Sequence, residues 1–232
     1  AGFAVSYGGL RVDVGNVSNV FDSGDQVDLY GYGVGFTSFL EHNAAFDAPA
    51  NHAFDQNADD TTTIKVRYTV GDFSASLSYS DTRPSIAVPA TPGSAGKAAV
   101  VDAEQLQLGV GYTLANGMTI GAAYSDTETA GASVEDWIIG LNGTAGAFGY
   151  SVIVGDSDRA NYDVAFGASV NYEVSSATSI RAMVSTGGDD ANDTAYGLGF
   201  RHGLGGGVTL AGGVGSNTSG NTMADLGVVF NF

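Results

Sequence analysis

The chain has 232 residues, which is enough for one large β domain or two small ones. Its net charge of −17, from 25 acidic and 8 basic residues, argues against a nucleic-acid partner, because phosphate binding needs a basic face. The absence of cysteine excludes disulfides, thiolate metal sites and a thiol nucleophile, and no apolar run reaches the roughly 18 residues of a transmembrane helix.

Alternation of apolar and polar residues predicts about thirteen β-strands. In chain order they are 1–7, 10–15, 61–70, 73–81, 104–114, 118–126, 135–143, 148–155, 162–174, 179–185, 194–202, 208–215 and 223–232. The clearest is 61–70, where Ile64 and Tyr68 share one face and Lys65 and Arg67 the other. By itself such a strand fits either a soluble sandwich or a transmembrane barrel, in which the apolar face contacts lipid.

The connections between the expected strands favour the barrel. They are short after every odd-numbered strand and generally longer after the even-numbered ones, the longest being 17–60. Short turns on one rim and long loops on the other are typical of outer-membrane barrels, whereas a sandwich or a lipocalin-like fold has no reason to sort its loops in this way. The predicted fold is therefore a single all-β domain, a transmembrane antiparallel up-and-down β-barrel.

Aromatic residues on the outward face gather near the expected strand ends, as two interfacial girdles would require. They are Tyr7, Tyr68, Phe73, Tyr79, Tyr112, Tyr124, Trp137, Phe148, Tyr162, Tyr172, Tyr196 and Phe232. The general enrichment of aromatics in strands explains their number but not their preference for the ends. Such barrels have an even strand count with both termini on the short-turn side, so thirteen strands predict that an odd number is missing before Ala1.

Three stretches carry a resemblance to a known family: SYGGLRVDVGNVSNVFDS near the start, DTAYGLGF at 193–200 and MADLGVVFNF at the end. They resemble the trimeric general diffusion porins of Gram-negative outer membranes, especially the alphaproteobacterial type. The resemblance implies a barrel of about sixteen strands, a homotrimer in membrane lipid, and a third loop folded into the lumen at about 17–60. If 10–15 is the fifth strand, three strands would be missing.

Charge placement indicates what such a pore would conduct. The strand-borne cations all fall on the polar face: Arg11, Lys65, Arg67, Arg181 and Arg201. The 17–60 segment has no Lys or Arg and carries Asp22, Asp25, Asp28, Glu41, Asp47, Asp55, Asp59 and Asp60. The resemblance implies a constriction in which the basic wall faces acids of the loop (Asp22, Asp25, Asp28, Glu41 and Asp47) together with Asp13. The expected function is passive diffusion of small hydrophilic solutes and ions, although these charges would also suit a solvated loop and a merely polar wall.

A metal site has weaker support. Asp55, Asp59 and Asp60 begin like a calcium loop, but Asp60 stands where an EF-hand needs glycine and Val66 where it needs glutamate. The family resemblance makes Ca²⁺ plausible at these acids, a solvated loop is the alternative, and no cofactor is required.

Two alternatives to an open pore are an outer-membrane barrel enzyme and a plugged structural or adhesin barrel. The histidines are His42, His52 and His202, and no GxSxG or HExxH motif is present. A barrel enzyme predicts a lipid-facing Ser/His pair, whereas we expect no histidine on the lipid face. A plugged barrel predicts no conductance.

Overall fold

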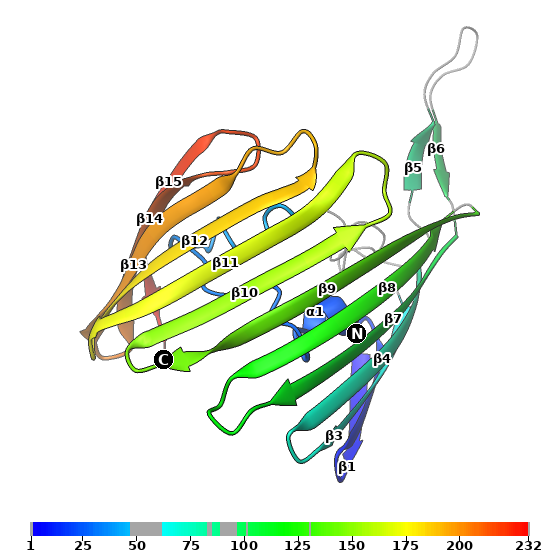
Figure 1. The fold of residues 1–232 in the computed structure, drawn as a ribbon, viewed down its shortest axis with the longest axis horizontal. Helices are drawn as coiled ribbons and strands as arrows, with labels where there is room; N and C mark the ends of the chain where they lie inside the picture. Colours follow the sequence, from blue (N-terminus) through cyan, green and yellow to red (C-terminus); the bar gives the residue numbers. More distant parts are fainter. Residues whose placement is uncertain are drawn as a thin grey trace, which may run out of the picture.

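The computed structural model describes residues 2–46, 62–82, 85–88, 97–100, 102–129 and 131–231. Its main feature is a 13-stranded sheet in which each strand pairs antiparallel with the next along the chain (Figure 1). The strands are β1 (Gly2–Tyr7), β2 (Leu10–Gly15), β3 (Thr62–Val70), β4 (Phe73–Thr82), β7 (Ala103–Thr113), β8 (Thr119–Thr129), β9 (Ala132–Ala145), β10 (Phe148–Ser157), β11 (Tyr162–Ser175), β12 (Thr178–Asp189), β13 (Ala195–Gly205), β14 (Val208–Ser216) and β15 (Thr222–Phe230). A short helix, α1 (Val20–Ser23), and a separate hairpin of β5 (Ser85–Val88) and β6 (Lys97–Val100) complete the described elements.

The sheet curls so that one side is concave, and β1 and β15 form its two edges (Figure 1). The predicted all-β, up-and-down architecture is confirmed, with the expected strands in the expected order. Two local expectations differ. The 82–101 stretch, expected to be a loop, contains the β5–β6 hairpin. In addition, β8 extends to Thr129 and β9 begins at Ala132, within the expected 127–134 loop. Their ladder continues through Thr127 opposite Val134, β-branched residues that favour a strand even on the long-loop rim.

The two faces of the sheet are reversed relative to a soluble protein. On the convex side large apolar residues are exposed, such as Leu77 at 48% and Leu198 at 61%. On the concave side Ser78 and Gln107 are buried. An apolar exterior around a polar interior is the pattern of a barrel in lipid. Among the described residues, no helix is both long and apolar enough to span a membrane.

Ten of the twelve predicted girdle aromatics are exposed. Phe232 lies outside the described residues, and the prediction for Tyr162 is wrong. A register irregularity between Asp163 and Phe166 breaks the alternation, so Tyr162 turns inward and packs against the buried cluster described next.

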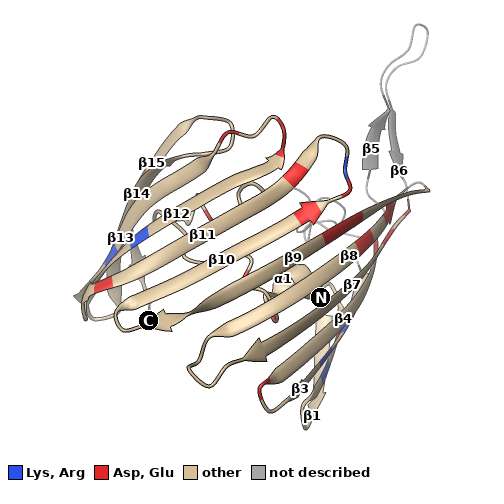
Figure 2. Cartoon of the chain, viewed as in Figure 1, with Lys and Arg blue, Asp and Glu red and all other residues tan. Residues whose placement is uncertain are grey.

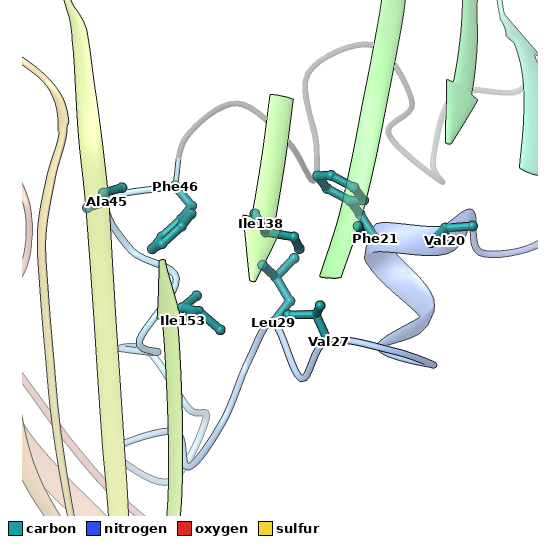
Figure 3. Packing of buried hydrophobic residues seen from close by; sticks show 10 residues of the cluster. Val20, Phe21, Val27, Leu29, Ala45, Phe46, Ile138 and Ile153 are labelled. Carbon is teal, nitrogen blue, oxygen red and sulfur yellow. The ribbon is translucent and has the colours of Figure 1, made fainter. Parts of the chain in front are cut away.

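Buried apolar side chains lie between the wall of the sheet and residues 17–46, which we call the inward segment. Figure 3 shows Val27, Leu29 and Phe46 of this segment beside Ile138 of β9 and Ile153 of β10. A second cluster joins Val34 and Leu40 to Met183 of β12 and Ala195 of β13. The inward segment is therefore packed onto the wall by apolar contacts near both of its chain ends and in its middle.

Candidate functional site

The inward segment follows the concave face from β2 to β15 and then returns (Figure 1). Backbone hydrogen bonds mark this path, each donated by the segment to a wall side chain. The acceptors are Gln107 Oε1 of β7 for Phe21 N (3.0 Å), Ser169 Oγ of β11 for Tyr32 N (2.8 Å), Asp225 Oδ1 of β15 for Phe36 N (2.7 Å) and Ser185 Oγ of β12 for Ala45 N (2.9 Å). Wall polar groups thereby satisfy backbone donors that an irregular buried segment would otherwise leave unpaired.

The start of the segment is shaped by α1. The side chain of Asn19 caps the helix by accepting from Asp22 N at 2.9 Å, and Gly24 ends it with a left-handed φ of 64°. This tight reversal places Asp25 immediately beyond the helix, where it meets β3.

Glycines on the wall make room for the segment. A Cβ at Gly121 would meet the carbonyl oxygen of Gln26, one at Gly167 the carbonyl oxygen of His42, and one at Gly227 the ring of Phe36. We use the name glycine track for nine wall glycines at which an added Cβ would meet the segment: Gly109, Gly121, Gly140, Gly149, Gly167, Gly197, Gly213, Gly215 and Gly227. The track shows that the segment lies flat against the wall along its length.

Asp25 joins the segment to a group of charges that we call the Asp25 cluster: Arg11, Asp13, Asp25, Lys65 and Arg67. Strand register places Arg11 opposite Arg67 and Asp13 opposite Lys65, all on the concave face. Arg11 Nη2 lies 2.7 Å from Asp13 Oδ1, and Lys65 Nζ lies 3.0 Å from Asp25 Oδ2. Arg67 also forms an ion pair with Asp25. These five residues line a polar cavity of about 480 Å³ together with Val17, Ser18 and Ser23.

The two carboxylates explain why three cations can share this patch, since like charges opposite one another on neighbouring strands repel. The side chain of Lys65 is only 8% exposed, whereas those of Arg11 and Arg67 are 45% and 36% exposed and face the cavity. The sequence suggested a water gap between loop acids and basic wall. For Asp25 that gap is absent, because its carboxylate bonds the wall directly.

The other predicted loop acids have different surroundings. Asp22 Oδ1 accepts from Tyr30 Oη at 2.8 Å, and Asp28 Oδ1 accepts from Gly31 N at 2.9 Å, so both help to fold the segment itself. Glu41 is half-buried, and its pKa is raised by burial and by the neighbouring Asp28. Asp47 lies outside the described residues.

His42 is the most buried titratable group of the segment. Its Nδ1 lies 3.1 Å from Ser169 Oγ of β11, and its Nε2 lies 3.1 Å from the carbonyl oxygen of Asp28. Burial lowers its pKa, because a charged imidazole is poorly solvated there. His42 therefore serves as a neutral tie between the segment and the wall.

The five predicted wall cations do not form one group. Arg181 of β12 and Arg201 of β13 lie far around the sheet from the Asp25 cluster, and Figure 2 shows basic patches on both parts of the wall. Arg181 donates to Asn171 Oδ1 (3.2 Å) and to the carbonyl oxygen of Gly33 (3.4 Å), with its guanidinium 5.7 Å from the centroid of the Tyr32 ring. Within the described part of the chain, neither arginine has a carboxylate within ion-pair distance.

Asp225 is a site residue that the sequence reasoning missed. Its Oδ1 accepts from Phe36 N, and its Oδ2 accepts from Thr37 N at 2.8 Å and Thr37 Oγ1 at 2.9 Å. It thus holds the inward segment at Phe36 and Thr37, where the segment reaches the edge strand β15. The sequence did contain a signal for it. Asp225 is the one acidic residue of MADLGVVFNF, and it lies on the face opposite Leu226, Val228 and Phe230.

Neither a metal centre nor a hydrolytic site is evident in the residues that the structure describes. They include no group of three or more His, Cys, Asp or Glu residues able to hold a metal ion, and Asp55, Asp59 and Asp60 lie outside them. The expectation of no outward histidine is wrong for His202, which alternates onto the face of Leu198 near the short-turn end of β13. There its Nδ1 shares a 2.8 Å hydrogen bond with Thr178 Oγ1, so the pair is His/Thr and not the Ser/His pair of a barrel enzyme.

The sequence profile of the family described as Gram-negative porin matches residues 1–222. The chain belongs to the Gram-negative porin family. It is 31% identical over 248 residues to a porin of Fuscovulum blasticum, covering all of this chain and 76% of that one. It is 28% identical over 229 residues to a porin of Rhodobacter capsulatus, covering 87% of this chain and 71% of that one.

Solved structures give the same fold. Mutant forms of Rh. blastica porin superpose on all of this porin and 76% of their own chains, with TM-scores of 0.71 and 0.72 at 24% identity. The protein is therefore an outer-membrane porin, a channel for passive diffusion and not an enzyme. The inward segment lies on the lumen side of its wall.

Proposed function

We propose that small hydrophilic solutes and ions cross this porin through a constriction bounded by the inward segment and the Asp25 cluster. The observation that carries the proposal is the path of the segment, which occupies the concave side of the sheet and is tied to β3 by Asp25 and to β15 by Asp225. A segment held inside the lumen at these two points reduces the cross-section that a solute can use.

The charges of the Asp25 cluster would select polar solutes. Three cations and two carboxylates line one polar cavity, and the half-exposed guanidinium groups of Arg11 and Arg67 can replace water around a passing solute. An apolar solute would disturb this hydration without compensation. The net charge of −17 over the whole chain adds a weak preference for cations.

Loop acids other than Asp25 have smaller roles in this proposal. Glu41 and Asp28 add negative potential beside the lumen, while Asp22 and Asp28 hold the fold of the segment. Asp47, Asp55, Asp59 and Asp60 remain predictions, including Ca²⁺ at the last three.

We also infer a homotrimer, on the strength of the family resemblance of the three sequence stretches. Chemical crosslinking of the detergent-solubilised protein, followed by denaturing electrophoresis, tests it. A ladder ending at three subunits supports the trimer, and a monomer at every crosslinker concentration contradicts it.

Single-channel conductance of the purified, membrane-inserted protein tests the pore. We expect large ohmic steps, a cation-side reversal potential in a salt gradient, and a cut-off in the size of neutral sugars that enter proteoliposomes. Replacing Arg11 and Arg67 by glutamine should move the reversal potential further towards cations. If the protein is folded and inserted but the membranes show no channel current, the open pore is contradicted and a plugged barrel is supported.

A further inference from the structure

A second polar cavity lies on the concave face where strands β11 to β14 approach the short-turn rim. It measures about 390 Å³, and its lining includes Asn171, Glu173, Ser179, Arg181 and Arg201. The turn at 176–177 closes it on one side, and Arg181 contacts Gly33 of the inward segment on another. The cavity therefore lies between the inward segment and the rim that short turns mark as periplasmic.

The arginines of this cavity have donors to spare. The neighbours of Arg201 in the strand register are Ser179 and Ala211, whose short side chains bring no carboxylate to it. Its Nε is buried and has no hydrogen-bond partner among the residues that the structure describes. Arg181 has Asn171 and Gly199 as neighbours and forms two long hydrogen bonds to neutral oxygens.

No acidic residue in the described part of the chain neutralises this pair. Glu173 also lines the cavity, but it is exposed and lies beyond ion-pair distance of both arginines. Asp225 lies at the register level of Arg181 three strands away, and both of its oxygens accept from Phe36 and Thr37. Two guanidinium groups with unused donors are suited to a carboxylate or phosphate, which can accept two parallel hydrogen bonds from each.

We propose that Arg181 and Arg201 form a binding subsite for small oxyanions at the periplasmic mouth of the pore, beyond the inward segment. The site takes solutes that carry a carboxylate or a phosphate group, and the lumen wall around it keeps lipid headgroups away. An anion that has passed the inward segment is held briefly at this point, which raises its local concentration there. The subsite needs an open pore but does not depend on the role proposed for the Asp25 cluster.

Block of the sodium chloride current by citrate or inorganic phosphate tests the subsite. Each anion is added to one side of a bilayer that holds oriented channels. We expect block at a lower concentration from the periplasmic side. Arg181→Gln and Arg201→Gln should each raise the half-blocking concentration about tenfold, the size expected for losing one charge-assisted contact. Arg181→Lys should keep part of the block, since it retains the charge but not the planar donor pair.

Arg159→Gln is the matched control, because it removes one arginine from the 158–161 connection on the opposite rim. It should leave the half-blocking concentration unchanged. An equal shift in Arg159→Gln would show a general field effect and overturn the subsite. Unchanged block in Arg181→Gln and Arg201→Gln, with a shift in Arg11→Gln, would place anion binding at the Asp25 cluster instead. The sodium chloride conductance before citrate or phosphate is added reports separately on the pore itself.

Discussion

The two groups of basic residues on the inner wall of this porin have opposite surroundings. In the Asp25 cluster, Asp13 comes from the same strand as Arg11, and Asp25 reaches Lys65 and Arg67 from the inward segment. Around Arg181 and Arg201 the segment offers only a carbonyl oxygen and the Tyr32 ring. Both groups occupy the polar face of their strands. Arg11 is neutralised by Asp13 of its own strand, whereas Lys65 and Arg67 are neutralised because the path of the segment brings Asp25 to them.

Removing the carboxylate of Asp25 should erase most of this difference. In Asp25→Asn, Lys65 loses its ion pair while it stays almost entirely buried, which should cost about 3 kcal/mol of unfolding free energy. The reversal potential in a salt gradient should shift towards anions. Asp72→Asn, in the turn between β3 and β4, removes the same charge at an exposed position and should shift it much less. Equal shifts of the reversal potential in the two variants would mean that the ion pairs of Asp25 do not affect ion selectivity.

Lifting the segment should disrupt the Asp25 cluster without changing any charge. In Gly121→Ala the new methyl group meets the carbonyl oxygen of Gln26, next to Asp25, and the crowding should cost about 2 kcal/mol. The reversal potential should shift towards anions, as it should in Asp25→Asn. Gly203→Ala is the control, because the nearest described atom beyond its two chain neighbours, Ala177 O, lies 3.8 Å from the position that its new methyl group would occupy. A Gly121→Ala channel identical to the wild type would show that the segment does not fit tightly there.

Weakening the hydrogen bonds to Asp225 should loosen the middle of the segment, at Phe36 and Thr37. Asp225→Asn replaces one acceptor oxygen by an amide donor that cannot bond Phe36 N or Thr37 N, at a cost of about 1–2 kcal/mol. We expect greater noise in the open-channel current. Thr37→Val removes only the hydroxyl bond to Asp225 and should give a smaller rise. Open-channel current noise equal to that of the wild type in both variants would contradict a tether at this point.

The smallest expected effect is a pH dependence at His42, which follows the Phe36 and Thr37 tether along the segment. The lowered pKa of His42 means that unfolding takes up a proton below the ordinary value of 6.5, so the seating of the segment weakens as the pH falls through that value. Glu41 acts oppositely, since its raised pKa means that acidification relieves a buried charge beside Asp28. Current noise should therefore increase from pH 7.5 to 6 in the wild type and less in His42→Gln. The same rise in His42→Gln would exclude the imidazole as its source.

Most of the wall could be predicted from the sequence, because alternation with a period of two reports directly which side chains share a face. It placed Lys65 and Arg67 together on the concave side, and it failed where the alternation itself is broken, as in the bulge that turns Tyr162 inward. It could not predict that β8 and β9 continue to residues 130–131, since that extension depends on cross-strand pairing.

The path of the inward segment could not be predicted in the same way. Its contacts join residues far apart in the sequence, such as Phe36 with Asp225 and Gln26 with Gly121, and no local pattern encodes them. Asp25 was one of several acids in a loop, and nothing in the sequence distinguished it from Asp22 or Asp28. The inward glycines were visible, but their purpose depends on what lies against them.

A disulfide between the segment and the wall would test the central claim most directly, namely that the segment lies flat on the glycine track. The Cβ of Val27 lies 3.5 Å from the position of a Cβ at Gly140, inside the range of about 3.5–4.5 Å found in disulfides. The chain has no cysteine, so Val27→Cys with Gly140→Cys can form one pair alone. We predict spontaneous oxidation in the folded, inserted protein with an almost unchanged conductance, and no bond in the control pair Val27→Cys with Gly203→Cys. Free thiols in the first pair, or a bond that forms only with a large change in conductance, would contradict the account.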